Sequence, residues 1–406
     1  MIANLNIDHF IETFVTKREI SLLKDDFKKY HSELEQKINN KSVLVIGGAG
    51  TIGSSYIKAI LKFNIAKLVV VDINENGLTE LVRDIRSSGG YNIPDELITY
   101  PVNFGDRVFE KLFQFHGPFE IVANFAAHKH VRSEKDIFSI EAMIENNVLR
   151  ARKLLDILLQ YPPEHFFCVS TDKAANPVNI MGASKKLMEE LIMAYSDKLP
   201  IVTARFANVA FSNGSLPLGF LERIQKKQPW SCPRGIRRFF VSPQESGELC
   251  LMASIMGESG DIFFPKLDED RDMIPFDQIA IDLLKTLGLT PDICQTEDEA
   301  RQKALSLNEL STSYPIYFFG SDTSGEKSFE EFFTENEKLE LEQFVNLGVV
   351  KNSKKRPVKE IDEIFERLHL LFTSSEITKA KIVEILKEYL PNFAHIETGK
   401  GLDSQM

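Results

Sequence analysis

A run of polar side chains directly follows a short apolar segment near the middle of the chain. The apolar segment Phe166–Val169 has the composition of a buried strand, and the next four residues are Ser170, Thr171, Asp172 and Lys173. In an open parallel sheet the carboxyl ends of the strands face the ligand crevice, so we expect these side chains to face a binding site. An adjacent carboxylate and amine can exchange protons with a substrate. The alternative is a surface ion pair, which the position at a strand end disfavours.

A glycine-rich sequence follows an earlier apolar segment, Val43–Ile46. The spacing of Gly47, Gly50 and Gly53 is typical of a strand-to-helix turn that binds a dinucleotide. Gly47 would make the tight turn, Gly50 would let the backbone approach a pyrophosphate, and Gly53 would let the helix pack closely on the strand. The pyrophosphate would bind at the helix N-terminus, because free N–H groups and the helix dipole attract anions. A glycine-rich turn without a ligand is the alternative.

An acidic residue ends the next apolar run. Asp72 lies nineteen residues after Gly53, where a carboxylate would accept hydrogen bonds from an adenosine ribose. Residues 73–76 contain no Arg or Lys that could bind a 2′-phosphate, so the sequence favours NAD over NADP. Asp106 follows the third predicted strand, where it could cap the next helix or reach the adenine edge.

The elements that position these residues alternate along the chain. Short β-branched runs separated by helical segments predict a parallel sheet with helices on both faces, at 43–46, 68–73, 97–102, 120–124, 166–169 and 201–206. We therefore predict an α/β fold with a Rossmann-type doubly wound sheet and a smaller C-terminal substrate-binding lobe. We predict four parts: an N-terminal helical extension (1–40), an NAD-binding Rossmann domain (41–210), a segment that is mainly the substrate-binding lobe (211–350), and a linker with C-terminal helices (351–406). These last helices are expected at about 359–371 and 376–389.

Composition argues against several classes of protein. The chain has 48 Lys and Arg against 59 Asp and Glu, a formal net charge of −11, whereas nucleic-acid binding needs clustered positive charge. No run of eighteen apolar residues and no apolar leader is present, so we expect a cytoplasmic protein without membrane insertion. The cysteines are too far apart for a metal knuckle, and no metal is expected: Cys168, Cys232, Cys250 and Cys294.

Several segments together resemble one family. They are the glycine loop, AAHKHV at 126–131, NNVL at 146–149, STDKAANPVNIMGASK at 170–185, RFANV at 205–209, NGS at 213–215 and RFF at 238–240. Over residues 41–285 the chain resembles extended short-chain dehydrogenases/reductases of the polysaccharide-biosynthesis (CapD-like) branch, and is most similar to UDP-N-acetylglucosamine 4,6-dehydratases. The resemblance implies an NAD-dependent lyase that acts on a UDP-sugar for surface glycan synthesis. It also implies a homo-oligomer.

The resemblance assigns roles to individual residues. Lys173 would remove the proton from carbon 5 of the hexose, Asp172 would protonate the hydroxyl that leaves carbon 6, and Thr171 would bind the carbon 4 oxygen. The implied cofactor contacts are Gly47, Gly50, Thr51, Ile52, Gly53, Asp72, Asp106, Ala126 and Lys185. The implied substrate contacts are Lys129 and His130 at the sugar, and Asn208, Ser215 and Arg238 at the UDP group, with Arg234 or Arg237 as alternatives to Arg238. His130 could instead cap or pack.

The departure from the family pattern that affects the chemistry is at residue 181. The family usually has Tyr four residues before Lys185, but this chain has Met181, whose thioether cannot exchange a proton. The resemblance extends to a subgroup of dehydratases with Met at this position, so activity is still expected. Deprotonation of the carbon 4 hydroxyl would pass to Asp172, Lys185 or an ordered water. Alternatives are a UDP-sugar C4-epimerase, which needs no carbon 5 base, and a catalytically silent NAD-binding regulatory protein.

Overall fold

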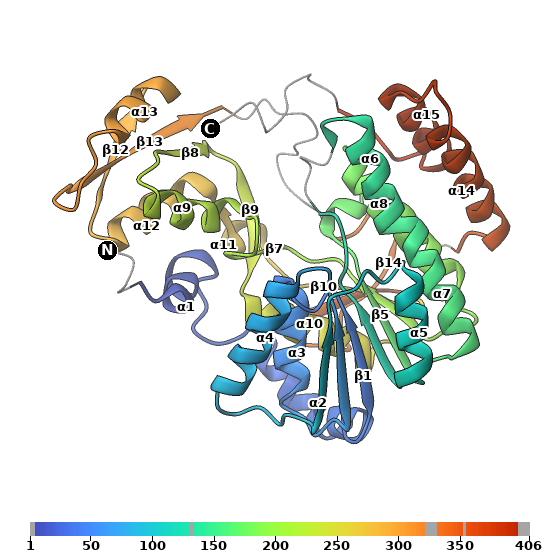
Figure 1. Ribbon diagram of the computed structural model, residues 1–406. Helices are drawn as coiled ribbons and strands as arrows, with labels where there is room; N and C mark the ends of the chain where they lie inside the picture. Colours follow the sequence, from blue (N-terminus) through green and yellow to red (C-terminus); the bar gives the residue numbers. More distant parts are fainter. Residues whose placement is uncertain (1–4, 130–133, 321–330, 352–354, 397–406) are drawn as a thin grey trace.

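The computed structural model describes residues 5–129, 134–320, 331–351 and 355–396 (Figure 1). Nine strands from these ranges form one sheet in the order β14-β15-β10-β6-β5-β4-β1-β2-β3. The pairing is parallel from β3 to β10, and β15 and β14 add antiparallel strands at one edge. The bounds are β1 Ser42–Ile46, β2 Lys67–Val71, β3 Glu96–Tyr100, β4 Ile121–Asn124, β5 His165–Val169, β6 Ile201–Ala204, β10 Ile262–Pro265, β14 Lys338–Glu340 and β15 Leu347–Lys351.

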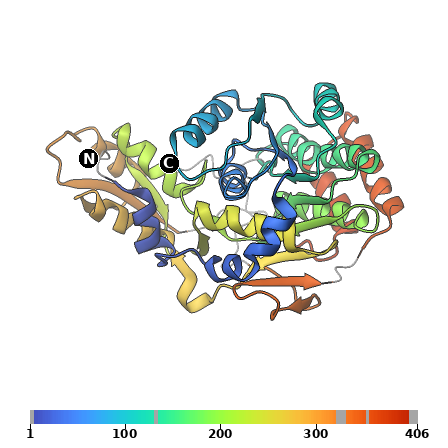
Figure 2. The same ribbon diagram turned by 90° about the horizontal axis from the view of Figure 1, so that it is seen from below.

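The six strands expected from the sequence, β1 to β6, lie in the order 3-2-1-4-5-6, which is typical of a Rossmann sheet. Helices cover both faces, as Figures 1 and 2 show, with α3 and α10 packed together on one face and α7 and α8 on the other. The predicted fold class is therefore confirmed. The helical segments of the part of the chain around the large sheet are α3 Thr51–Ile60, α4 Glu75–Ser87, α5 Arg107–His116, α6 Ile137–Ile144, η4 Glu145–Leu149, α7 Arg150–Gln160, η5 Asp172–Ala174, α8 Ile180–Ala194 and α10 Pro243–Met256.

Three strands from beyond residue 210 complete the sheet. β10 pairs with β6, β15 pairs with β10, and β14 pairs with β15. The edge of β6 would otherwise present unpaired N–H and C=O groups, and these additional strands satisfy them. The expected division at residue 210 therefore does not separate the large sheet from the lobe, because β10 lies between lobe segments in the chain and β14 and β15 follow them.

The lobe contains two small sheets, with strand orders β11-β9-β7 and β12-β13-β8. A second apolar core fills it, separate from the core around the large sheet, and includes Phe220, Trp230, Phe240 and Ile279. The lobe elements are β7 Asn208–Val209, α9 Leu216–Gln225, β8 Trp230–Pro233, β9 Arg237–Val241, α11 Glu269–Asp272, β11 Met273–Pro275, α12 Phe276–Thr286, β12 Thr290–Cys294, α13 Glu297–Ala304 and β13 Ser313–Phe319.

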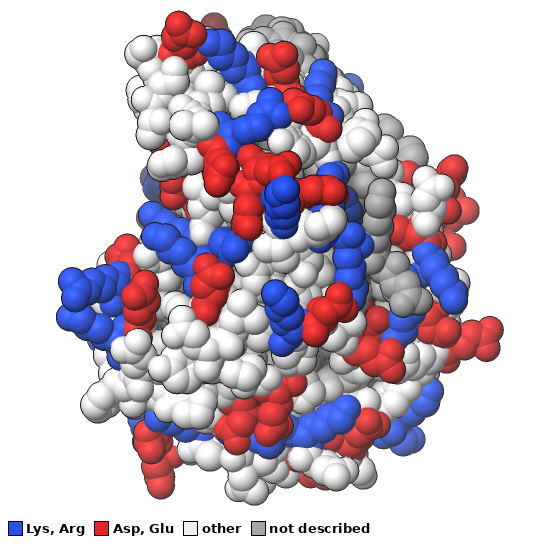
Figure 3. All heavy atoms as spheres, turned by 90° about the vertical axis from the view of Figure 1, so that its right-hand side faces the viewer, with Lys and Arg blue, Asp and Glu red and all other residues white. Residues whose placement is uncertain are grey.

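The described segments nearest the two chain ends are helical, as the periodicity predicts. At the N-terminus lie α1 (Ile7–Phe10), a π-helical turn η2 (Ile11–Val15) and α2 (Lys24–Ile38). At the other end, α14 (Val358–Phe372) and α15 (Lys379–Tyr389) pack beside α7 and α8, as Figure 1 shows. The face that carries them displays interspersed acidic and basic side chains (Figure 3). No helix in the described ranges combines the length and the low charge that a bilayer span requires.

Candidate active site

The glycine loop between β1 and α3 is packed so closely at Gly47 and Gly53 that a side chain would not fit at either position. Gly47 has φ +76°, and a Cβ there would lie 2.6 Å from the backbone nitrogen of Ala126. A Cβ on Gly53 would lie 2.2 Å from the carbonyl oxygen of Gly47. The hydroxyl of Thr51, the first residue of α3, accepts a hydrogen bond from Asn213 N at 3.0 Å, which ties this helix to the lobe. The helix N-terminus is thus held directly above the carboxyl end of β1.

The acidic residue after β2 faces this loop. Its Oδ2 accepts a hydrogen bond from Ala49 N at 3.0 Å, and its Oδ1 accepts one from Asn74 N at 2.9 Å, so the Asp72 carboxylate is fixed beside the loop. The glycine turn, the helix N-terminus and this carboxylate fit an adenine dinucleotide. Asp106 occupies the N-cap position of α5 but makes no capping hydrogen bond with its exposed side chain. Ala126 lies where β4 ends, and its N–H donates to Asn124 Oδ1 at 3.0 Å.

A cavity of about 260 Å³ opens where β5 and β6 end and the lobe begins. Nine of the candidate site residues line it: Ile52, Lys129, Thr171, Asp172, Lys173, Met181, Lys185, Asn208 and Ser215. Four aromatic residues that have no role in the predicted site also line it: Phe125, Phe206, Phe240 and Phe276. Phe206 and Phe240 lie within segments that carry the family resemblance, which was the signal available for them.

The carboxylate of Asp172 is the most hydrogen-bonded group of this cavity. Its side chain is buried in the short helix η5, and Oδ1 accepts hydrogen bonds from Thr171 Oγ1 at 2.6 Å and from Lys173 N at 2.9 Å. The same oxygen accepts a third from Lys173 Nζ at 3.2 Å, while the side chain of Lys173 stays 25% exposed. The amine can therefore reach both the carboxylate and the cavity.

The start of α8 supplies the second pair of cavity residues. The side chain of Asn179 caps this helix by accepting a hydrogen bond from Gly182 N at 2.7 Å. Met181 and Lys185 lie on one face of the helix because they are four residues apart. Lys185 Nζ donates to Val169 O at 3.2 Å. Burial lowers the pKa of Lys185 to about 8, because an ammonium is costly to keep away from water, and the nearby Cys168 offsets this only in part.

A hydrogen-bonded asparagine holds the loop after β4 against α8. Asn147, in the π-helical turn η4, accepts from His128 N at 2.8 Å and donates to His128 O at 2.9 Å and to Ser184 Oγ at 3.1 Å. Ser184 in turn donates to Met181 O at 2.7 Å. This contact fixes the loop that carries Lys129, whose pKa is lowered because the surrounding protein removes water from the ammonium. His130 lies outside the described residues.

The other implied substrate contacts are on the lobe side. Ser215 caps α9 by accepting from Leu218 N at 3.4 Å, and Asn208 Nδ2 donates to Phe239 O at 3.4 Å. Arg238 is buried and donates to Arg237 O at 2.9 Å, and it is not among the residues that line the cavity. Within the described residues, no three His, Cys, Asp or Glu side chains gather as metal ligands.

A buried ion-pair network supports the end of β5, after which the candidate acid–base residues follow. Ser170 Oγ donates to Glu189 Oε2 at 3.0 Å, and Arg205 Nε donates to the same oxygen at 3.0 Å. Arg205 also bonds both carboxylate oxygens of Glu337, at 2.8 and 2.9 Å. Burial alone would raise the pKa of Glu189, but Arg205 and Lys186 outweigh it and lower the pKa to about 2. Sequence reasoning missed this network because its members lie far apart in the chain.

We expect the change Arg205→Met to lower the free energy of unfolding by about 3–5 kcal/mol at pH 7, because it leaves buried carboxylates without their cation. The folded pKa of Glu189 is below its unfolded value, so the network's contribution is complete above about pH 5 and is lost as pH falls toward 2. Urea unfolding at pH 7 and pH 4 should therefore show that the free energies of unfolding of Arg205→Met and of the unchanged protein differ less at pH 4 than at pH 7. The control Lys186→Met removes a more exposed partner and should cost about 1 kcal/mol or less. A difference that does not change with pH would contradict this account.

Solved structures share this architecture. Pen from Bacillus thuringiensis matches with a TM-score of 0.62 and 20% identity, covering 82% of this chain and 99% of that chain. DesIV, a dTDP-glucose 4,6-dehydratase from Streptomyces venezuelae with NAD and TYD bound, matches with a TM-score of 0.54 and 17% identity, covering 72% and 88%. At these identities the likeness shows a shared fold.

Sequence relatives carry the comparison further. The Methanocaldococcus jannaschii protein named "Uncharacterized membrane protein MJ1061" is 28% identical over 86% of this chain and 96% of its own length. The capsular polysaccharide biosynthesis protein CapD of Staphylococcus aureus is 28% identical over 57% of this chain, and the match spans only 38% of CapD. A UDP-glucose 4-epimerase of Rickettsia typhi is 30% identical over 56% of this chain and 66% of its own length.

The sequence profile of one family matches residues 43–352, most of the chain. The chain therefore belongs to the polysaccharide biosynthesis protein family, as its motifs predicted.

Proposed function

We propose that this protein is an NAD-dependent UDP-N-acetylglucosamine 4,6-dehydratase. The observation that carries the proposal is the single cavity that brings together Asp172, Lys173 and Lys185 beside the end of the glycine loop. The similarity to CapD, named for capsular polysaccharide biosynthesis, supports a sugar nucleotide as substrate. The fold shared with a 4,6-dehydratase that binds NAD supports the reaction type.

The chain's own residues fit NAD at the glycine loop. The N-terminus of α3 would bind the pyrophosphate, Asp72 the adenosine ribose and Lys185 the nicotinamide ribose. When bound, NAD would accept a hydride from carbon 4 of the hexose and return one to carbon 6. On the substrate side, Asn208, Ser215 and Arg238 would bind UDP, and Lys129 with His130 would bind the sugar. Arg238 would need to move to reach the cavity.

The Asp172–Lys173 pair holds one proton in a position that suits elimination. A ketone at carbon 4 makes the carbon 5 proton acidic, and a neutral Lys173 would accept it, while a protonated Asp172 would donate to the departing carbon 6 hydroxyl. The ion pair in the structure differs from this neutral pair only in the position of one proton, which would move from Nζ to Oδ1 along the 3.2 Å hydrogen bond that joins them.

The base for the carbon 4 hydroxyl would be Lys185, since Met181 lies beside it without a proton-accepting group. Thr171, whose hydroxyl proton points to Asp172, would act on the carbon 4 oxygen only after rotating. Because Lys185 has a pKa of about 8, its neutral form becomes abundant as pH rises through that value. We expect kcat to increase from pH 7 to 9 with a midpoint near 8, measured by product formation under saturating substrate. The change Lys185→Arg should remove this rise, since arginine stays protonated. A flat or falling profile in the unchanged protein would exclude Lys185 as the base.

The decisive experiment is incubation of the purified protein with UDP-N-acetylglucosamine without added reductant. A product lighter by one water, detected by mass spectrometry, is expected. The second candidate is a C4-epimerase, which the similarity to UDP-glucose 4-epimerases favours. An unchanged mass with an altered configuration at carbon 4 would establish that reaction instead. Tight NAD binding with no turnover would indicate a regulatory protein.

A further inference from the structure

The N-terminal segment bridges the two apolar cores of the molecule. Phe10, Ile11 and Val15, from α1 and η2, are buried in the core of the lobe. Leu34 and Ile38, from α2, are buried in the core around the large sheet. The short connection between η2 and α2 therefore crosses from one body to the other.

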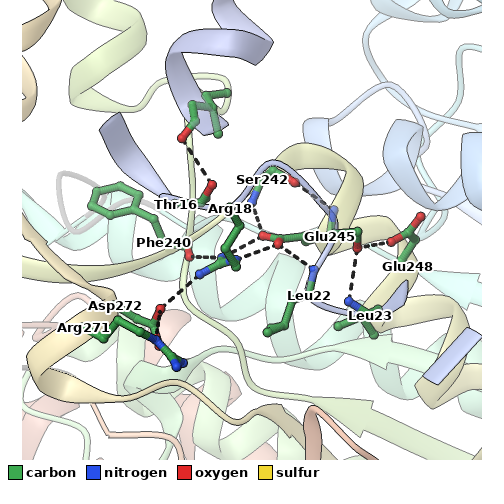
Figure 4. Close-up of polar contacts among 12 residues, drawn as sticks. Thr16, Arg18, Leu22, Leu23, Phe240, Ser242, Glu245, Glu248, Arg271 and Asp272 are labelled. Atoms are coloured by element: carbon green, nitrogen blue, oxygen red, sulfur yellow. Dashed lines mark hydrogen bonds and ion pairs between the residues drawn. The ribbon is translucent and has the colours of Figure 1, made fainter. Parts of the chain in front are cut away.

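Arg18 lies in this connection, and its guanidinium binds both bodies (Figure 4). Nε and Nη2 donate to the two carboxylate oxygens of Glu245, each at 2.9 Å. Nη1 donates to Asp272 Oδ1 at 3.2 Å, and Nη2 also donates to Phe240 O at 3.1 Å. The Arg18 side chain is only 16% exposed, and both carboxylates are buried. Charged and two-pronged contacts shielded from water are among the strongest that a side chain makes.

One partner belongs to the cofactor-binding body. Glu245 lies in the first turn of α10, which packs on α3, the helix of the glycine loop. Its carboxylate also accepts from Ser242 N at 2.8 Å and from Leu22 N at 2.9 Å, so it is fixed to the helix end and to the N-terminal segment. Arg18 therefore binds a carboxylate that cannot easily move.

The other partners belong to the β11-β9-β7 sheet. Phe240 is in β9, and Asp272 directly precedes β11. In the same sheet, Asn208 of β7 pairs with Phe240, and both residues line the cavity. Arg18 itself does not line that cavity. Its contacts with Phe240 O and Asp272 hold the sheet from outside the cavity.

We infer that Arg18 is a positioning residue that holds the β11-β9-β7 sheet against the cofactor-binding body and so sets the affinity for the sugar nucleotide. The inference rests on the proposed function, because a UDP-sugar is the ligand that this side of the cavity would bind. A lysine cannot replace the guanidinium, since one ammonium lacks the planar fork that reaches Glu245 and Phe240 together.

The test compares Arg18→Gln with Arg271→Gln. Arg271 also binds Asp272, through Nη2 at 2.8 Å, but it is 70% exposed and is a matched control for loss of a positive charge. For Arg18→Gln we expect the Kd for UDP, from calorimetry, and the KM for UDP-N-acetylglucosamine to rise roughly tenfold, because small misplacements of binding groups are costly. We expect kcat and bound NAD to change less than about twofold, and Arg271→Gln to match the unchanged protein.

A second readout does not depend on the ligand. Amide hydrogen exchange in the ligand-free protein should become faster in β9 and β11 of Arg18→Gln, and stay unchanged in β1. Unchanged exchange and UDP affinity would overturn the inference, as would equal losses of kcat, NAD and UDP binding. If the glutamine variant does not fold, Arg18→Lys is measured in the same way and should show faster exchange in β9 and β11. Failure of the unchanged protein to bind UDP would count against the proposed function, whereas the exchange result would still decide the role of Arg18.

Discussion

Changing Lys173 to Met is expected to abolish the loss of water from UDP-N-acetylglucosamine while NAD remains bound. The side chain keeps its length but loses the amine that lies 3.2 Å from the Asp172 carboxylate. Without that amine, the proton on carbon 5 has no acceptor, and Asp172 has no neighbouring ammonium from which to take the proton that it donates. Since positioned acid–base groups contribute up to about 10⁴-fold, we expect kcat to fall by about 10³-fold or more, measured by mass spectrometry of the product.

The control for this variant is Lys153→Met, which removes an exposed lysine on α7 that does not line the cavity. It should leave both activity and NAD content unchanged. Loss of NAD together with activity in Lys173→Met would mean that the residue is structural. Dehydration at the original rate would show that the pair is not the acid–base group of the reaction.

Changing Gly53 to Ala should remove NAD binding and destabilise the protein. The added Cβ would lie 2.2 Å from the carbonyl oxygen of Gly47 and 2.9 Å from the Cα of Gly48. Both contacts are with backbone atoms, so α3 would have to move away from the turn. We expect a loss of about 1–3 kcal/mol in the free energy of unfolding from this overpacking, measured by urea unfolding. Assay of NAD released from the purified protein should show little cofactor.

Substitutions at two other glycines distinguish an effect on stability from an effect on NAD binding. A Cβ on Gly50 would meet only Gly47 O, at 3.4 Å, so Gly50→Ala should fold normally and lose NAD because the methyl group occupies the approach to the pyrophosphate. A Cβ on Gly89 would have no atom within 4 Å, so Gly89→Ala should change neither property. Unchanged NAD content in both Gly50→Ala and Gly53→Ala would exclude this turn as the cofactor site.

Short segments of the sequence were enough to predict much of the fold and part of the candidate site. Strands β1 to β6 were predictable because buried parallel strands require continuous β-branched runs. The positions of Thr171 to Lys173 followed, since residues after a parallel strand project at the carboxyl edge of the sheet. The spacing of Met181 and Lys185 placed them on one helix face. These are short-range consequences of chain geometry.

Contacts between distant segments were not predictable in this way. The partners of Arg205, Glu189 and Glu337, come from a helix sixteen residues back and a segment more than a hundred residues on. The pairing of β10, β15 and β14 with the large sheet likewise depends on which sheet edge is open to them in the folded protein. No periodicity in the sequence encodes such pairings, because each depends on the final packing of two separately formed elements.

The amino-acid sequence by itself determined the alternating strands and helices, the glycine turn with its acidic partner, and the chemical groups at the end of β5. The tertiary structure alone decided that Asp172 is buried and accepts three hydrogen bonds, and that Lys185 is buried so that its pKa falls to about 8. It also decided that Arg18 joins the large-sheet body to the β11-β9-β7 sheet. The physical reason is range: backbone geometry and side-chain periodicity act over a few residues, whereas burial and charge pairing depend on every segment that packs around a group.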